Sequence, residues 1–325
     1  MYHYEPKELS VREVHRLLIG GVGPRPIALV STLSEEGIPN LTPFSFFNAF
    51  GANPPVIAFS PSRRRRDASF KDTYFNLIKT KECVVQAVTY SMVEQVNLAS
   101  TEYPSGINEF IKSGLTPVDS DLVKPKRVKE SPFQMECKLL KMESFGEGGS
   151  SANIAICEVL KFHVAEDIFI NKIIHPELID LIGRMSGNFY TRAKDSIFET
   201  EQPGQKKCIG YDSLPEFMKN SFIYSANNLG KFATTDKIPS DNETLLFIEE
   251  IKKEFVKDFE ATEEAFYRYE RQSNYKTMLK IALSLIEGNH PKGKILLELS
   301  AKCALENADS DFAWKTALFV KHLSR

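Results

Sequence analysis

Six short runs rich in β-branched and aromatic residues dominate the first ~200 residues, and turn signals separate them. The runs span residues 26–33, 38–45, 55–60, 82–90, 133–142 and 153–165. The connections at residues 34–37 and 146–151 are too short for a parallel crossover, so the runs they join are expected to pair antiparallel. Six or more strands with few helices indicate a mainly β fold, a barrel or a sandwich rather than a doubly wound sheet.

Two short helices are expected to interrupt these strands. Ser10 with Glu13, and Ser91 with Glu94, both match the capping box Ser-x-x-Glu. Each pair precedes apolar residues at helical spacing, which predicts a helix beginning directly after each serine.

The pattern changes after about residue 200. Residues 199–207 are polar and broken by Pro203 and Gly204, which is typical of a linker. Apolar residues then recur at three- and four-residue intervals, for example Leu245, Ile248 and Ile251. We therefore expect a β domain over residues 1–200 and an α-helical C-terminal region over residues 211–325, with packing or partner contact as its simplest role.

Composition narrows the class of protein. A net charge of -2 gives no general attraction to nucleic acid or to an anionic membrane. No apolar run approaches the ~20 residues of a membrane span, and residues 1–10 lack the pattern of a signal peptide. The five cysteines are widely spaced and never form a Cys-x-x-Cys pair, which favours packing roles in a reduced, cytoplasmic protein. The six histidines are scattered, so no metal site is expected.

The first candidate site lies at the ends of the early strands. Polar side chains cluster there beside a dense aromatic run, a mixture that suits a planar heteroaromatic ligand. The alternative is a Phe-rich core strand followed by a Pro-fixed turn. The residues of this segment that we expect to contact the ligand are Arg25, Ser31, Thr32, Thr42, Ser45, Phe46, Phe47 and Asn48.

The second candidate site is the arginine-rich segment at residues 60–73, which leaves a strand and enters a helix. Free amides at a helix N-terminus attract an anion, and Lys71, Thr73 and one or more of the arginines 63–66 can complete such a site. Asp72 fits the N-cap position. An arginine run alone would more often be a solvated loop or a weak nucleic-acid patch, so the position between strand and helix is what favours phosphate.

Four segments together resemble the flavin-reductase-like, FMN-binding split-barrel family. They are Pro24-Arg25-Pro26-Ile27-Ala28, the run at 42–48 before Asn53-Pro54-Pro55, Lys71-Asp72-Thr73 with Asn76, and the Gly-Arg…Gly…Tyr pattern of Gly183, Arg184, Gly187 and Tyr190. The resemblance covers residues 10–195 and implies a split β-barrel. The region beyond residue 210 departs from the family pattern.

The family implies a homodimer with FMN near the subunit interface. It also implies hydride transfer from NADH or NADPH to flavin, with an oxygenase, a metal or another electron acceptor as the recipient. By position, residues 45–48 would border the ring system, and Ser60, Arg64, Lys71 and Thr73 would hold the phosphate with Asp72 as the helix cap. Arg184 and Tyr190 would lie near the nicotinamide or the dimer interface. His175 would either contact substrate or cap a turn.

Two functions of different classes follow from this sequence. The leading interpretation is an enzyme, an NAD(P)H-dependent FMN reductase-like oxidoreductase, because direct hydride transfer needs binding and orientation rather than a catalytic triad. The alternative is a non-catalytic FMN-binding or redox-sensing module acting through its C-terminal helices. Nucleic-acid binding through residues 63–66 is disfavoured by the slightly negative total charge.

Overall fold

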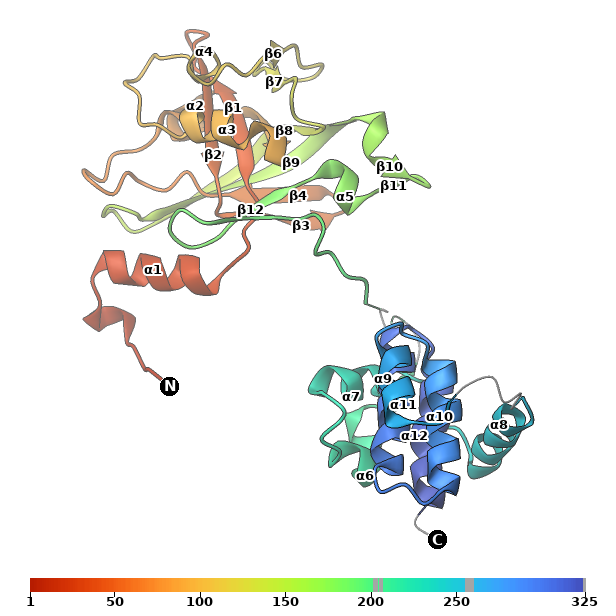
Figure 1. Ribbon diagram of the computed structural model, residues 1–325. Coiled ribbons are helices and arrows are strands. Elements are labelled where there is room, and N and C mark those ends of the chain that lie inside the picture. The colour runs from red at the N-terminus through yellow and green to blue at the C-terminus, as the bar shows by residue number, and fades with distance from the viewer. Residues whose placement is uncertain (201–203, 205–206, 255–259, 324–325) are drawn as a thin grey trace. The chain divides into compact units, whose positions relative to one another are not determined.

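The computed structural model describes residues 1–200, 204, 207–254 and 260–323. The chain divides into two compact units, Met1–Glu199 and Thr200–Arg325. Figure 1 shows the strands in the first unit and the helices α6–α12 in the second. The expected polar linker falls largely on residues 201–203 and 205–206, which lie outside the described residues.

A seven-stranded antiparallel sheet with the order β2-β1-β5-β8-β9-β4-β3 forms the first unit. The short connections predicted before β2 and between β8 and β9 do join antiparallel neighbours. This confirms a mainly β domain followed by helices. The strands are β1 (Ala28–Leu33), β2 (Pro39–Phe44), β3 (Phe47–Ala52), β4 (Pro55–Phe59), β5 (Glu82–Ala87), β8 (Phe133–Phe145) and β9 (Ala152–Val164).

Smaller elements cover the sheet. Helices α2 and α3 lie across β1 and β2 (Figure 1), and each contacts at least one of these strands. The short helices are α1 (Val11–Gly21), α2 (Asp72–Thr80), α3 (Val93–Ala99), α4 (Glu109–Ser113) and α5 (Pro176–Ile179), with 3-10 turns η1 (Pro6–Glu8), η2 (Tyr90–Met92) and η3 (Glu166–Ile168). The short strand pairs are β6 (Pro117–Val118) with β7 (Arg127–Val128), β10 (Phe169–Ile170) with β11 (Ile173–Ile174), and β12 (Ile182–Arg184) with β13 (Tyr190–Arg192).

Side chains alternate between the two faces of β1, so this strand contributes to two hydrophobic cores. Ala28 and Val30 face the core inside the sheet, whereas Leu29 faces a second core beneath α3 and α4. A strand buried on both faces explains why its residues 28–30 are all apolar. Cys83, Cys137 and Cys157 are fully buried in the first core, which confirms the packing role predicted for them.

One of the two predicted capping boxes forms. The Ser10 side chain accepts the Glu13 N–H, and the Glu13 carboxylate accepts the Ser10 N–H at 2.9 Å. The second prediction is wrong, because the 3-10 turn η2 passes through Ser91 and α3 begins only at Val93. A 3-10 turn before a helix moves the N-cap position, so the local motif alone could not fix where the helix starts.

The second unit packs helices around Trp314, which is 1% exposed and meets the Phe232 ring edge-on at 5.1 Å. Ile248 and Ile251 are buried as expected, while Leu245 is exposed.

Within the described residues, no helix is long and apolar enough to span a membrane. The helices are α6 (Glu216–Lys219), α7 (Ala226–Ala233), α8 (Asp241–Lys253), α9 (Glu263–Glu270), α10 (Tyr275–Glu287), α11 (Gly293–Glu306) and α12 (Ser310–Leu318), with 3-10 turns η4 (Tyr211–Ser213) and η5 (Phe319–His322).

Candidate functional site

The arginine-rich segment forms a folded turn that leads into α2. The Arg64 backbone N–H donates to the Ser69 carbonyl at 2.8 Å, and the Ala68 N–H donates back to the Arg64 carbonyl at 3.0 Å. The Arg64 guanidinium also donates to the carbonyl of Phe70. We call residues 60–71 the cation loop. Its internal bonds make it an ordered turn in which Arg63 and Arg64 are partly buried, while Arg65 and Arg66 are exposed to solvent.

The cation loop brings two positive charges together at the start of α2. Burial first, and the nearby Arg64 charge second, lower the pKa of the half-buried Lys71 ammonium. Asp72 lies 3.9 Å from Arg64 and offsets part of this charge. An anion would stabilise two cations that are held close together at a helix N-terminus.

The predicted cap at Asp72 is wrong. Lys71 occupies the N-cap position and makes no side-chain cap hydrogen bond, and Asp72 is the first helical residue. The Asp72 carboxylate instead accepts from the Ser105 hydroxyl at 3.1 Å and faces Arg64. No side chain caps α2, and the Tyr74 N–H donates to the Lys71 carbonyl at 2.9 Å, so the N–H groups of Asp72 and Thr73 are the first-turn amides left for a ligand.

A buried polar network lies beneath this helix. The Thr73 hydroxyl donates to the Asn40 side-chain oxygen at 2.8 Å, and the Asn76 amide donates to the Thr32 hydroxyl at 3.0 Å. The Thr42 hydroxyl accepts from the Asn40 amide at 3.4 Å. The structure thus gathers Thr32, Thr42 and Thr73, but Thr73 is fully buried and its hydroxyl proton is already engaged.

Ser31 and Thr32 lie on opposite faces of β1, since successive side chains of a strand alternate. The Ser31 hydroxyl donates to the Lys126 carbonyl at 2.5 Å, away from the Thr32 network. The structure therefore does not bring Ser31 to the other predicted residues.

Three predicted residues from distant segments meet at a small cavity of about 170 Å³. Ser45, Arg184 and Tyr190 line it, together with apolar side chains that include Ile27, before β1, and Val93 and Val96 of α3. Ser45 follows β2, and the neighbouring Phe46 carbonyl accepts the Ser60 backbone N–H at 2.9 Å. The turn after β2 is thereby tied to the start of the cation loop.

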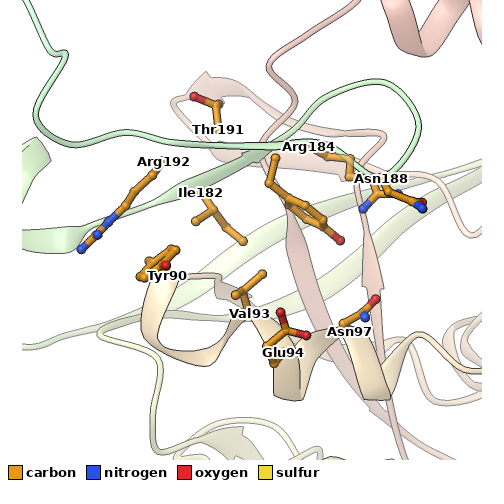
Figure 2. Close-up of a pocket in the computed structure, with 10 residues that line it drawn as sticks. Tyr90, Val93, Glu94, Asn97, Ile182, Arg184, Asn188, Thr191 and Arg192 are labelled. Carbon is orange, nitrogen blue, oxygen red and sulfur yellow. The ribbon is translucent and has the colours of Figure 1, made fainter.

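A larger polar cavity of about 530 Å³ adjoins this one and shares Arg184 and Tyr190 with it (Figure 2). The Arg184 guanidinium lies over the Tyr190 ring at 4.4 Å from its centroid, and Arg192 lies over Tyr90 at 4.1 Å. The lining residues are Tyr90, Val93, Glu94, Asn97, Ile182, Arg184, Asn188, Tyr190, Thr191 and Arg192.

Sequence reasoning missed the α3 side of this cavity. Glu94 was interpreted as a capping-box residue, but the shifted start of α3 places it in the cavity wall with Asn97. No sequence signal links residues 90–97 to residues 182–192. The pairing of Thr89 with Leu181 brings these segments together.

The Arg25 side chain is held by backbone carbonyl groups. Its guanidinium donates to the carbonyls of Ile19 and Val22 near the end of α1, and to Met185 at 2.9 Å. The side chain is only 5% exposed, and burial first, then the Arg184 charge, lowers its pKa. Phe46 lies beside it, with the ring centroid 6.0 Å from the guanidinium carbon.

The remaining predicted residues lie elsewhere. Phe47 and Asn48 line an apolar cavity of about 400 Å³ beside β3 and β4. Phe44, the last residue of β2, is buried in the core inside the sheet and Phe47 packs against that core, whereas the rest of β3 is exposed. The aromatic run is therefore a core strand only in part. His175 is the N-cap residue of α5 and makes no side-chain cap hydrogen bond; it lines neither cavity beside Tyr190.

Asp121, Glu136 and His163 form a potential metal-ligand cluster among the described residues. The buried Glu136 carboxylate accepts backbone N–H groups of residues 121, 122 and 123 and lies 2.6 Å from the His163 ring nitrogen. Burial opposes the charged form, but these hydrogen bonds outweigh it and lower the pKa of Glu136. The cluster anchors a loop with bonds that a metal would have to displace.

Comparison with known proteins places the first unit among flavin reductase-like domains. The model of the flavin reductase like domain matches residues 21–179. An uncharacterized protein of Aquifex aeolicus is 38% identical over 188 residues, which are 58% of this chain and 93% of the relative. The uncharacterized protein YwrF of Bacillus subtilis is 32% identical over 196 residues, covering 59% of this chain and 95% of the relative.

Solved structures give the same result. Nitrilotriacetate monooxygenase component B from Bacillus cereus is 32% identical with a TM-score of 0.57, covering 62% of this chain and 98% of that one. The 2-nitrobenzoate 2-nitroreductase NbaA of Pseudomonas fluorescens is 27% identical with a TM-score of 0.55, covering 63% of this chain and 99% of that one. A Shewanella frigidimarina protein with a split barrel domain has a TM-score of 0.53, at 22% identity and 62% coverage of this chain, which supports the split-barrel fold.

Proposed function

Because this chain belongs to the flavin reductase-like family, we propose that it binds FMN and is an NAD(P)H-dependent oxidoreductase. The observation that carries the proposal is the meeting of Lys71 and Arg64 at the uncapped start of α2. The turn that follows β2 ties this loop to the cavity lined by Ser45, Arg184 and Tyr190. A ligand that carries both a phosphate and a ring system would place the phosphate at the cation loop and the ring system at this cavity.

The residues present fit FMN. Burial first, and Arg64 second, lower the pKa of Lys71 although Glu102 and Asp72 oppose the shift, and a bound phosphate would stabilise the charged ammonium there. When bound, FMN would accept a hydride from NADH or NADPH and pass the electrons on. The protein then has to bind and orient two rings, for which Arg184 stacked on Tyr190 offers a planar surface beside Ser45.

The recipient of the electrons is proposed from the relatives. One similar structure is a component of a monooxygenase, and another is a nitroreductase of an aromatic substrate. We therefore propose that this protein delivers electrons to an oxygenase partner or to an organic acceptor.

The proposed activity is tested by measuring steady-state oxidation of NADH and NADPH with added FMN. Oxidation no faster than without protein would favour the non-catalytic FMN-binding module instead.

FMN is expected to bind at least tenfold more tightly than riboflavin. A charge-assisted hydrogen bond contributes roughly 1.5–3 kcal/mol, and riboflavin lacks the phosphate that Lys71 and Arg64 would contact. Quenching of flavin fluorescence in titrations with the purified protein measures both dissociation constants. Equal affinities would show that the cation loop does not hold the phosphate.

We also propose a homodimer. Helix α1 is amphipathic but buries none of its residues within the chain, and Leu18 and Val22 are 51% and 58% exposed. Phe50 on β3 is 70% exposed, beside the apolar cavity of about 400 Å³. Apolar surface of this kind is typical of a protein–protein interface. Light scattering at micromolar concentration is expected to give twice the chain mass, and a monomer with full FMN affinity would contradict this.

A further inference from the structure

The cation loop is held from outside by the β8–β9 hairpin. The Arg63 N–H donates to the Ser151 carbonyl at 3.0 Å, and the Ser150 N–H donates to the Arg63 carbonyl at 3.2 Å. A third contact comes from the fully buried Asn153, whose amide donates to the Pro61 carbonyl at 3.1 Å. All three contacts are made to the loop backbone, so they fix its path whatever its side chains do.

The closest approach is at Gly149 in the tip of this hairpin. A Cβ atom there would lie 2.9 Å from the Arg65 carbonyl carbon and closer still to the carbonyl oxygen. The obstacle is backbone, which cannot move aside as the end of a flexible side chain can. At the neighbouring Gly148, a Cβ atom would meet nothing within 4 Å. Only one of these adjacent glycines is therefore required by packing.

A displacement at Arg65 would be transmitted to Arg64. The Arg64 carbonyl accepts the Ala68 N–H, and its N–H donates to Ser69, so both peptide groups beside Arg64 are part of the turn. The Arg63 guanidinium also donates to the Ala68 carbonyl at 2.9 Å. Pushing the Arg65 carbonyl away from the hairpin therefore strains the same turn that aims the Arg64 guanidinium at the start of α2.

We propose that Gly149 is a positioning residue for the anion site, setting the place of the cation loop through backbone contact with Arg65. This inference rests on the proposed phosphate-binding role of that loop. Gly149 touches no ligand. Its absent side chain allows the β8–β9 hairpin to press the loop against α2, so that Arg64 and Lys71 reach one anion together.

The test compares Gly149→Ala with Gly148→Ala, the same substitution one residue away in open space. The first readout is the ratio of the riboflavin to the FMN dissociation constant, which isolates the phosphate. Gly149→Ala is expected to lower this ratio about tenfold, equivalent to ~1.4 kcal/mol, by weakening FMN binding alone. Gly148→Ala should leave the ratio unchanged. General destabilisation would weaken both flavins equally and would overturn the proposal.

The second readout needs no flavin. Trypsin cleaves after arginine, so its rate of cutting at residues 63–66 in the ligand-free protein reports how firmly the loop is held. Faster cutting in Gly149→Ala than in Gly148→Ala is expected, and equal rates would overturn the proposal. Faster cutting with an unchanged flavin ratio would support the hairpin contact but contradict the phosphate role of the loop. If Gly149→Ala does not fold, Asn153→Ala removes the Pro61 contact without adding atoms and should shift both readouts the same way.

Discussion

Lys71→Glu is expected to weaken FMN binding more than 100-fold while leaving riboflavin binding within a few-fold of wild type. The substitution removes a charge-assisted hydrogen bond of roughly 1.5–3 kcal/mol and adds repulsion between two anions. A combined loss of about 3 kcal/mol corresponds to more than two orders of magnitude in affinity. Titration of both flavins against the purified variant measures the effect.

The same substitution is expected to change the stability of the ligand-free fold only slightly. The folded-state pKa of Lys71 is lowered, first by burial and then by Arg64. Folding therefore disfavours its charged form, and this cost is fully present at pH below the folded pKa and fades as the pH rises towards the unfolded value. A charged glutamate would pay the same burial cost. Arg64 and the positive end of the α2 dipole would favour it, and the nearby Glu102 and Asp72 carboxylates would oppose it. Thermal unfolding at neutral pH checks this.

Lys79→Glu is the matched control, because it makes the same charge change near the other end of α2. Lys79 is exposed and pairs with the exposed Glu35 at 3.4 Å. We expect its FMN affinity to stay near wild type. If both variants lost FMN equally, the long-range charge of the domain rather than a local contact would account for the loss, and the assignment of Lys71 would be wrong.

Trp314→Ala is expected to destabilise the helical unit by about 3–5 kcal/mol, the usual cost of removing a buried large aromatic side chain. Trp314 is buried among the helices, and its indole N–H donates to the Phe232 carbonyl at 3.2 Å. The flavin affinity is expected to change less than tenfold, because the two units have separate cores. Phe222→Ala is the control, since Phe222 is 97% exposed in the same unit.

Urea unfolding separates the two units experimentally. Helical circular dichroism should show an earlier transition in Trp314→Ala, while flavin absorbance should report an unchanged transition of the barrel. In the wild type, the single tryptophan lies in the helical unit, so fluorescence excited selectively at tryptophan rather than tyrosine reports on that unit alone.

A chain ending at Lys207 should likewise stay folded and dimeric, and it should retain bound FMN after free FMN has been removed by gel filtration. Loss of flavin binding from that shortened chain, with the barrel still folded, would mean that the helices contribute to the site.

The local sequence determined the strands and the character of the cation loop. Alternating and continuous apolar runs fixed β1, β5, β8 and β9 because burial of each face follows directly from a two-residue period. The loop followed in the same way, since Arg64 and Lys71 lie seven residues apart in a turn that enters a helix. The charge of the loop and its place between a strand and a helix depend on neighbours in the chain, so the sequence by itself predicts them, whereas the distant β8–β9 hairpin holds the path of its backbone.

Features set by distant contacts were not predictable from sequence. The cap of α2 was misplaced by one residue, because the Asp72 carboxylate is engaged by Ser105 and Arg64 and does not cap the helix. Glu94 was assigned to a capping box, but a 3-10 turn precedes α3 and moves its start to Val93. Residues 90–97 and 182–192 share a cavity because an isolated bridge between Thr89 and Leu181 brings the two segments together. The sequence places Gly149 in the short connection at residues 146–151, but it does not show that a Cβ atom there would collide with the carbonyl of Arg65, 84 residues earlier in the chain. Tertiary packing decided these points because steric exclusion and buried hydrogen bonds act between atoms that the sequence does not place side by side.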